Sequence, residues 1–202
     1  MSTNILVFIE QRGGNILPAS FQLFTVAAEL AKGVGGQVQA VVVGQNVAGL
    51  TQQVASYGAK KVLVVDDAEL AMYRVMPYAA AVTAAIDAAQ PKVVLFPTTF
   101  LGRDLASRVA ARKRAALAID CTEVSLDGGD LIATKPVYAG KFSAKFRLSS
   151  SRLQVATVRS NAYAAPAPQA GASADVQQIP LTLRDVDKRA KIKEIASTSS
   201  GV

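Results

Sequence analysis

The chain has 202 residues, 50% of them hydrophobic, and a formal net charge of +7. This length and apolar content suffice for the core of one ordinary domain with a tail. Histidine is absent and Cys121 is the single cysteine, which excludes histidine-dependent nucleophiles, zinc sites of the His-Glu-x-x-His type and a disulfide within the chain. We therefore expect no catalytic residues and no metal site, in a protein kept in a reducing compartment.

The basic residues gather only weakly, at 112–114 and 188–193. Aromatic side chains do not alternate with them as they do in proteins that stack nucleic-acid bases, so we expect no nucleic-acid partner and a basic surface that faces solvent or another protein. No apolar run reaches the length of a membrane-spanning helix, and the first residues lack a signal or transit pattern. The sequence predicts a soluble chain without direct membrane insertion.

Four apolar, β-branched runs predict a parallel β-sheet. They occupy residues 5–9, 38–43, 62–65 and 93–96, and each is followed by a helical pattern. Strands that are apolar on both faces and alternate with helices are typical of a sheet covered on both sides. We expect a three-layer α/β domain with a parallel sheet, whose four strand–helix units end at about Ala116.

The first helix is expected to begin at Ser20, a good N-cap, and to end at about Lys32, before the glycine-rich residues 33–36. These glycines follow a helix and precede a strand, which is the reverse of the order in a phosphate-binding loop. They therefore predict the end of a helix.

The second helix is expected to begin at Asn46 and to close at the turn 57–59, and the third to run from Pro77 to about Ala89. Two adjacent carboxylates, at positions 66 and 67, end the strand between these helices. Neighbouring side chains in a strand point to opposite sides of the sheet, which argues against a cation site there.

Beyond residue 116 the hydrophobic period changes from helical to strand-like. Four apolar residues alternate with polar ones, which predicts a strand with one solvent-facing side: Phe142, Ala144, Phe146 and Leu148. Weaker strands are expected on either side, at 131–137 and 153–158, with turns at 127–130 and 139–141. A small antiparallel β appendage at one edge of the parallel sheet is the simplest arrangement.

Residues 164–174 carry no charge and no large side chain, so we expect a linker that does not pack. The α/β domain is thus predicted to span residues 1–163, followed by a linker and charged tail at 164–202. Within the tail, alternation indicates one more strand at 176–183, a weak helical pattern at 184–195 and the composition of a disordered end at 197–202. Such a tail suggests a chain that continues, or one that lies along a partner.

The candidate ligand site is Gly102-Arg103-Asp104, where the fourth strand meets a helix. Gly102 permits close approach of the backbone to a ligand, and a helix start offers N–H groups to a phosphate. Asp104 already complements the helix dipole, would repel a phosphate, and can pair with Arg108 one turn later. Two interpretations stay open: a structural helix start, or the edge of a nucleotide site. Residues 11–14, at the same edge, predict a turn with an exposed arginine or a partner contact.

Five stretches, in this order and spacing, resemble one family, the α subunit of electron transfer flavoprotein. They are residues 8–14 (FIEQRGG), 57–62 (YGAKKV), 102–112 (GRDLASRVAAR), 135–141 (KPVYAGK) and 157–159 (TVR). The chain departs from the family pattern at Lys135, where the family tends to have arginine, and at Ser160, where it has proline; both affect local contacts only. The resemblance covers about residues 4–202 and looks like the N-terminal domain of a two-domain family.

The resemblance implies an adenine-nucleotide-hydrolase-like, Rossmann-like fold that packs against an electron transfer flavoprotein β subunit about a pseudo-twofold axis. With FAD, the complete complex would carry electrons from dehydrogenases to a membrane-linked quinone oxidoreductase and the respiratory chain. Most FAD contacts of the family lie in a C-terminal domain without counterpart here, so no cofactor is expected for this chain alone. The implied role is an electron-carrier subunit and not an enzyme. In a bacterium the protein would lie in the cytoplasm. In a eukaryote it would lie in the mitochondrial matrix, although the sequence shows no transit peptide for that case.

A second hypothesis, from another class, is a stand-alone adenine-nucleotide-binding module that acts as a sensor or stress protein. Its motivation is Gly102-Arg103-Asp104 at the ligand edge of the sheet. Binding of AMP or ATP that is lost in Arg103→Ala would favour this module. A hydrolase or ligase ranks third, because the chain has no histidine.

Overall fold

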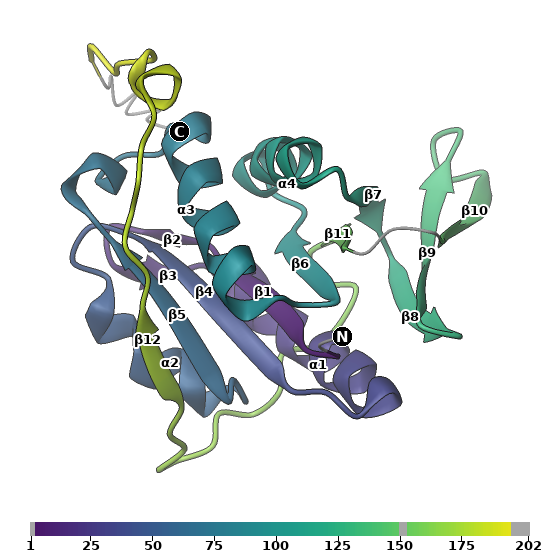
Figure 1. The fold of residues 1–202 in the computed structure, drawn as a ribbon. Coiled ribbons are helices and arrows are strands. Elements are labelled where there is room, and N and C mark those ends of the chain that lie inside the picture. The colour runs from purple at the N-terminus through teal and green to yellow at the C-terminus, as the bar shows by residue number, and fades with distance from the viewer. Residues whose placement is uncertain (1–2, 150–152, 195–202) are drawn as a thin grey trace, which may run out of the picture.

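The computed structural model describes residues 3–149 and 153–194, which are built around a parallel sheet. Seven strands stand in the order β12-β5-β4-β1-β6-β11-β7 (Figure 1). Their bounds are β1 (Ile5–Ile9), β4 (Val38–Gly44), β5 (Lys61–Asp66), β6 (Val93–Pro97), β7 (Ala116–Cys121), β11 (Gln154–Val158) and β12 (Asp175–Gln178). Each of the four apolar runs forms a strand, and β1 at the centre is buried throughout. The parallel sheet expected from the sequence is confirmed.

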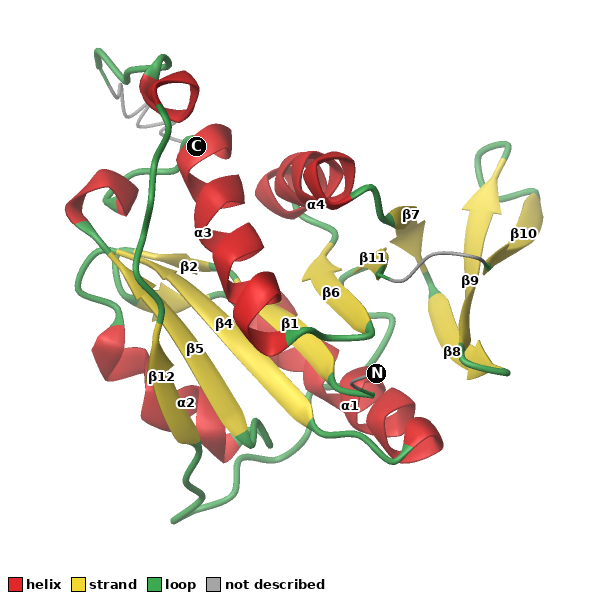
Figure 2. Ribbon diagram, in the orientation of Figure 1, coloured by secondary structure: helices red, strands yellow, loops and turns green. Residues whose placement is uncertain are grey.

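Helices cover both faces of this sheet (Figure 2). On one face lie α1 (Pro18–Val34) and α2 (Thr51–Ser56), and on the other α3 (Val75–Ala89) and α4 (Phe100–Lys113). Alternate residues of β1 therefore enter different cores: Val7 packs in the cluster of α1, and Phe8 in the cluster of α3 and α4. The architecture is the expected three-layer α/β fold of Rossmann-like type. Among the described residues, none of the helices is both long and apolar enough to cross a membrane.

The start of α1 differs from the expectation. Ser20 was expected as the N-cap, but the helix begins at Pro18 with Leu17 as N-cap residue, because proline suits the first helical position. The Ser20 hydroxyl is instead buried, where it accepts a hydrogen bond from the backbone N–H of Glu10 at 2.9 Å. The glycines end α1 as expected, but the helix runs to Val34 and includes Gly33; Gly35 has the left-handed φ of 63° that a glycine C-cap adopts.

The second helix starts later than Asn46, so that expectation is wrong. Asn46 has a φ of 56°, which is incompatible with a right-handed helix, and a 3₁₀ turn at Ala48–Leu50 precedes α2. The Asp66 carboxylate accepts hydrogen bonds from the backbone N–H groups of Asn46 (2.7 Å) and Val47 (2.8 Å). Asp66 thereby holds this loop against the end of β5.

Three antiparallel strands form an arm that stands away from the main sheet (Figure 1). They are β8 (Glu123–Asp127), β9 (Asp130–Val137) and β10 (Phe142–Leu148), in the order β10-β9-β8. The small antiparallel appendage is confirmed, with β8 as an additional strand. The expectation of one solvent-facing side on β10 is wrong, since six of its seven residues are exposed or half-buried and only Leu148 is buried.

The strand expected at 153–158 exists, but it does not flank β10. It is β11, which pairs in parallel with both β6 and β7 inside the main sheet. All five of its residues are buried, so it is covered on both faces like the other central strands, although Gln154 and Thr157 are polar. A short hairpin of β2 (Gln11–Arg12) and β3 (Asn15–Ile16) follows β1.

The uncharged segment 164–174 crosses to the far edge of the sheet and is held by hydrogen bonds, contrary to the expectation that it does not pack. Its Ala164 carbonyl accepts from Thr25 Oγ1 at 2.6 Å, and its Gln169 N–H donates to the Ser56 carbonyl at 2.8 Å. After it, β12 pairs with β5, so the sheet continues beyond the proposed division at residue 163. In the described part of 184–195 a 3₁₀ turn forms at Asp185–Lys188, and the end expected to be disordered, 197–202, lies outside the described residues.

Candidate functional site

The carboxyl ends of β1 and β6 meet at one edge of the sheet, which is where open parallel sheets bind ligands. Glu10 follows β1 directly and is 1% exposed. Its backbone is fixed by the start of α1: the Glu10 N–H donates to Ser20 Oγ, and the Leu17 N–H donates to the Glu10 carbonyl at 2.9 Å. The carboxylate is therefore held rigidly at the ligand edge.

Thr99 connects Glu10 to the N-terminus of α4. As N-cap of the helix, Thr99 Oγ1 accepts from the Gly102 N–H at 2.8 Å, and it donates to Glu10 Oε2 at 2.5 Å. The second carboxylate oxygen, Oε1, is buried and has no hydrogen-bond partner within residues 3–149 and 153–194. The start of α4 thus has a carboxylate of the protein beside it, which its dipole favours.

Gly102 has a packing role in this arrangement. A Cβ built at this position would lie 2.0 Å from the carbonyl oxygen of Pro97, a distance at which no side-chain carbon fits. The glycine therefore allows α4 to begin directly against the end of β6.

Arg103 and Asp104 make different contacts. The Arg103 guanidinium lies over the Phe100 ring, 5.3 Å from its centroid. Asp104 accepts a hydrogen bond from the Tyr73 hydroxyl at 2.8 Å, in place of the expected pair with Arg108. Burial, together with this hydrogen bond, raises the pKa of Tyr73 far above its ordinary value, so the hydroxyl stays protonated and keeps donating.

A cavity of about 530 Å³ opens at this edge, within the size range of small-molecule sites. It is lined by Gln11, Arg12, Gly13, Ala71, Met72, Tyr73, Tyr78, Phe100, Leu101 and Asp104. At its rim Phe100 is 88% exposed and Met72 is 49% exposed. The lining is mainly apolar and aromatic, with Asp104 as its carboxylate.

Of the three residues predicted from the sequence, Asp104 lines the cavity, whereas Gly102 and Arg103 do not. Sequence reasoning missed Glu10 and Tyr73. A signal for Glu10 existed, since it is a charged residue directly after five apolar strand residues, at the end where ligands bind. Tyr73 gave no signal, because only the tertiary fold brings the loop after β5 to the start of α4.

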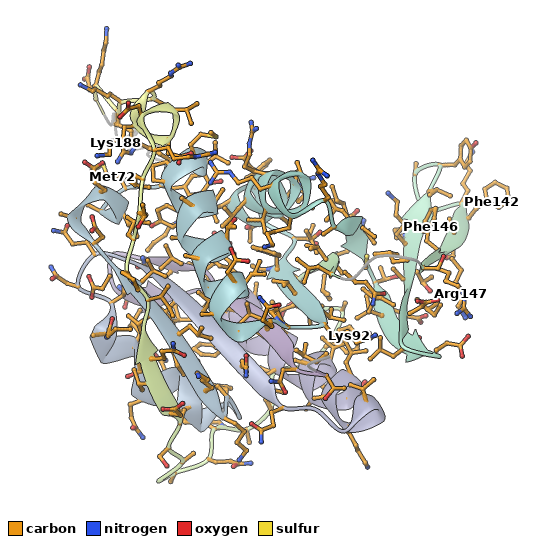
Figure 3. The ribbon with its side chains drawn as sticks, in the orientation of Figure 1. Met72, Lys92, Phe142, Phe146, Arg147 and Lys188 are labelled. Atoms are coloured by element: carbon orange, nitrogen blue, oxygen red, sulfur yellow. The ribbon has the colours of Figure 1, made fainter. Side chains whose placement is uncertain are left out.

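The arm carries a second candidate surface, which we call the aromatic face and define as Tyr138, Phe142 and Phe146. These residues are 78%, 65% and 45% exposed, and the rings of Tyr138 and Phe142 meet edge to face with centroids 5.9 Å apart. Figure 3 shows Phe142 and Phe146 on the arm, far from Met72. Lys141 and Lys145 beside them form no ion pair with any described residue. Exposed aromatic side chains gathered on one surface are typical of protein interfaces.

The C-terminal segment is fastened to the domain by Asp187, which is 1% exposed. Its carboxylate accepts from the guanidinium of Arg112 on α4 and from Arg184 Nε at 3.1 Å. Further along, Arg74 donates to the Ala190 carbonyl at 3.2 Å. Lys188 and Met72 line the same hollow and lie close together in Figure 3. The segment therefore leaves the domain next to the rim of the cavity.

Comparison with known proteins identifies relatives over the whole chain. The family described as electron transfer flavoprotein domain matches residues 5–183. Electron transfer flavoprotein subunit alpha of Clostridium acetobutylicum is 32% identical over 202 residues, which cover 98% of this chain and 60% of that protein. The protein of the same name from Bacillus subtilis is 31% identical over 203 residues, covering 100% and 61%.

A further relative is subunit LctC of the lactate dehydrogenase (NAD(+),ferredoxin) of Acetobacterium woodii, 31% identical over 199 residues that cover 98% of this chain and 48% of that protein. The chain thus spans about 60% of the length of the alpha subunits that it matches. The fold, the family match and the similarity over the whole chain agree. The chain belongs to the electron transfer flavoprotein family and is similar to its alpha subunits.

Proposed function

We propose that this chain is the platform domain of an electron transfer flavoprotein α subunit. With a β subunit and FAD, the complete protein carries electrons from dehydrogenases to a membrane-linked quinone oxidoreductase and the respiratory chain. The redox chemistry belongs to the flavin, and the protein supplies binding and positioning, so the chain is part of an electron carrier and not itself an enzyme. The match over residues 5–183 and the relatives named as alpha subunits support this proposal.

The ligand edge of this chain does not fit the phosphates of a dinucleotide such as FAD. The buried Glu10 carboxylate adjoins the start of α4, and Asp104 places a second carboxylate just beyond the first turn, one residue later than expected. Like charges repel, and a phosphate would have to lose its water shell to enter. We therefore assign the FAD contacts to the part of the relatives that this chain does not match, about 40% of their length.

The platform role rests on the surface at the cavity rim. Phe100 and Met72 expose large apolar side chains there, and the C-terminal segment is anchored beside them through Asp187. Lys188, Lys191 and Ile192 bring this segment next to Met72, so we infer that a domain joined through it could bury the apolar rim. We place the flavin domain on this edge of the sheet.

We assign the β subunit to the aromatic face of the arm. This exposed aromatic surface is the observation that carries the proposal of a heterodimer, because a monomer gains nothing from leaving three aromatic side chains in water. Large aromatic side chains, tyrosine among them, often dominate the binding energy at interfaces. The platform then has two contact regions, one for each partner.

Co-expression with the β subunit of the same source tests the proposal. The wild-type chain is expected to co-purify with the β subunit in a one-to-one complex. The double variant Phe142→Ser/Phe146→Ser should bind at least about tenfold more weakly, since hot-spot aromatics each contribute about 2 kcal/mol or more. Affinity is measured by titration calorimetry, and circular dichroism checks that the variant is folded.

Phe100→Ser is the matched control, because it removes an exposed phenylalanine from the cavity rim and leaves the arm intact. It should bind the β subunit like the wild type. If the arm variant binds the β subunit as tightly as the wild type does, the arm is not the contact surface. If the wild type does not bind the β subunit, the heterodimer is refuted. The purified chain alone should be colourless; stoichiometric bound flavin would contradict the assignment of FAD to another domain.

The alternative of a stand-alone nucleotide module has less support. Relatives over the whole chain are electron transfer flavoprotein alpha subunits, and the candidate residues Gly102 and Arg103 do not line the cavity. For localisation we propose the cytoplasm of a bacterium, in line with the bacterial sources of the relatives.

A further inference from the structure

Nucleotide-binding α/β domains often place a phosphate at the N-terminus of a helix that follows a strand, because free N–H groups and the helix dipole favour an anion there. The junction of β6 and α4 has this order in the present chain. We propose that Glu10 determines the ligand specificity of this edge: its carboxylate takes the place of a phosphate beside the α4 N-terminus and excludes nucleotides.

The first argument is position. Glu10 directly follows β1, which pairs with β6. Its backbone N–H is bonded to Ser20 and its carbonyl to Leu17. Its side chain then reaches the N-cap residue, Thr99, at 2.5 Å. With its backbone fixed in this way, the carboxylate can leave the helix start only by rotating its side chain, which would break its hydrogen bond with Thr99.

The second argument is the use of the amides at the helix start. The Gly102 N–H is taken by the Thr99 side chain at 2.8 Å, and the Arg103 N–H donates to the Thr99 carbonyl at 3.0 Å. The Thr99 hydroxyl has a single proton, which it gives to Glu10. The Gly102 N–H, one of the donors at the helix start, is therefore already engaged in a chain of hydrogen bonds that runs through Thr99 to the Glu10 carboxylate.

The third argument is charge. Arg12 is the cation among the residues that line the cavity, and it is exposed, so water and salt screen it. Glu10 is 1% exposed, and its field at the α4 N-terminus is screened much less. Asp104, just beyond the first turn of α4, adds a second carboxylate to the lining of the cavity. The balance opposes an incoming phosphate.

The fourth argument is the unpaired Oε1 of Glu10. Among the described residues no donor reaches this buried oxygen, and a buried acceptor is stabilised by a partner that donates a hydrogen bond. A phosphate dianion supplies only acceptors. A phosphate near Glu10 would therefore add further acceptors beside an acceptor that already lacks a donor.

Nucleotide titration of the full chain tests the proposal, with AMP and inorganic phosphate as charged probes and adenosine as the uncharged probe. The wild type is expected to bind neither AMP nor phosphate. Glu10→Gln keeps the side-chain size and removes the charge, and it should raise the affinity for AMP by at least about tenfold, the effect of one charge at a helix terminus. Any affinity for adenosine should change much less, since adenosine has no phosphate.

Two further variants keep the result decisive. Glu10→Ala removes both charge and bulk, and it should bind AMP at least as well as Glu10→Gln if either variant folds. Asp104→Asn removes the other carboxylate and should leave the wild-type exclusion in place. Saturable AMP binding by the wild type, no gain in a folded Glu10 variant, or a gain in Asp104→Asn alone would each overturn the proposal. Binding of the β subunit to the arm is measured separately, so a failure of this proposal can be distinguished from a failure of the proposed heterodimer.

Discussion

Gly102 lies where α4 begins against the carbonyl of Pro97, and its lack of a side chain can be tested directly. Gly102→Ala should lower the free energy of unfolding by about 2 kcal/mol, because the new Cβ would lie 2.0 Å from that oxygen and either α4 or β6 must shift. Urea denaturation measures the change. Gly33→Ala is the control of opposite sign: Gly33 lies inside α1 with no atom within 4 Å of its Cβ position, so alanine should stabilise by about 0.5 kcal/mol. Equal effects of both variants would contradict the packing role of Gly102.

Asp187 is the second residue whose contribution can be measured alone. Burial by itself raises its pKa, but hydrogen bonds from Arg184 and Arg112 outweigh this and hold the pKa below the ordinary range. Asp187→Asn should lower the free energy of unfolding at pH 7 by about 2 kcal/mol, because two guanidinium groups lose their anion. Asp185→Asn, on an exposed neighbour, should change it by less than about 0.5 kcal/mol.

The pH dependence of the same pair has a defined sign. A lowered pKa in the folded state stabilises the fold above the ordinary aspartate pKa of about 3.9, and this stabilisation is lost as the pH falls through the folded value. The difference in unfolding free energy between wild type and Asp187→Asn should therefore be largest near neutral pH and shrink below about pH 4. A difference that stays constant down to pH 3 would show that Asp187 acts through something other than its charge.

At the scale of elements, β12 protects the edge of the main sheet. It pairs with β5 over four residues, and Ile179 directly after it is buried in the core of α3 and α4. A chain that ends at residue 174 should melt about 5–10 °C lower than one that ends at residue 194, and it should aggregate as its concentration rises, since β5 becomes an open edge. Calorimetry and light scattering check both effects. Identical melting temperatures would mean that the segment after residue 174 adds no stability.

The same scale shows where hydrophobic pattern predicts structure and where it does not. The four buried runs, the C-cap at Gly35 and the turns of the arm were all predictable, because each depends on residues close in sequence. The hydrophobic pattern does not encode which strands pair with each other. From sequence order alone, β11 was therefore expected beside β10. The start of α1 was mispredicted because the Ser20 hydroxyl bonds to Glu10, a contact between two elements.

At the scale of the whole molecule, the candidate site was predictable in location and not in chemistry. The sequence indicated the junction of β6 and α4, where Asp104 indeed lines the cavity. The chemistry depends on Glu10 and Tyr73, which come from the ends of other strands and meet α4 only in the folded chain. The aromatic face could not be foreseen either, because alternation on β10 shows which residues share a side and not whether that side is covered.

The position of β11 has a consequence for synthesis on the ribosome. This strand lies between β6 and β7 although it follows both in the chain, and the whole arm separates it from β7. In a nascent chain that has emerged only as far as the arm, β11 is still missing. One edge of β6 therefore has unpaired backbone N–H and C=O groups. A polypeptide released by a stall within the arm should aggregate more readily than one released after Val158. A chaperone is therefore expected to matter most while the residues between these points are being synthesised.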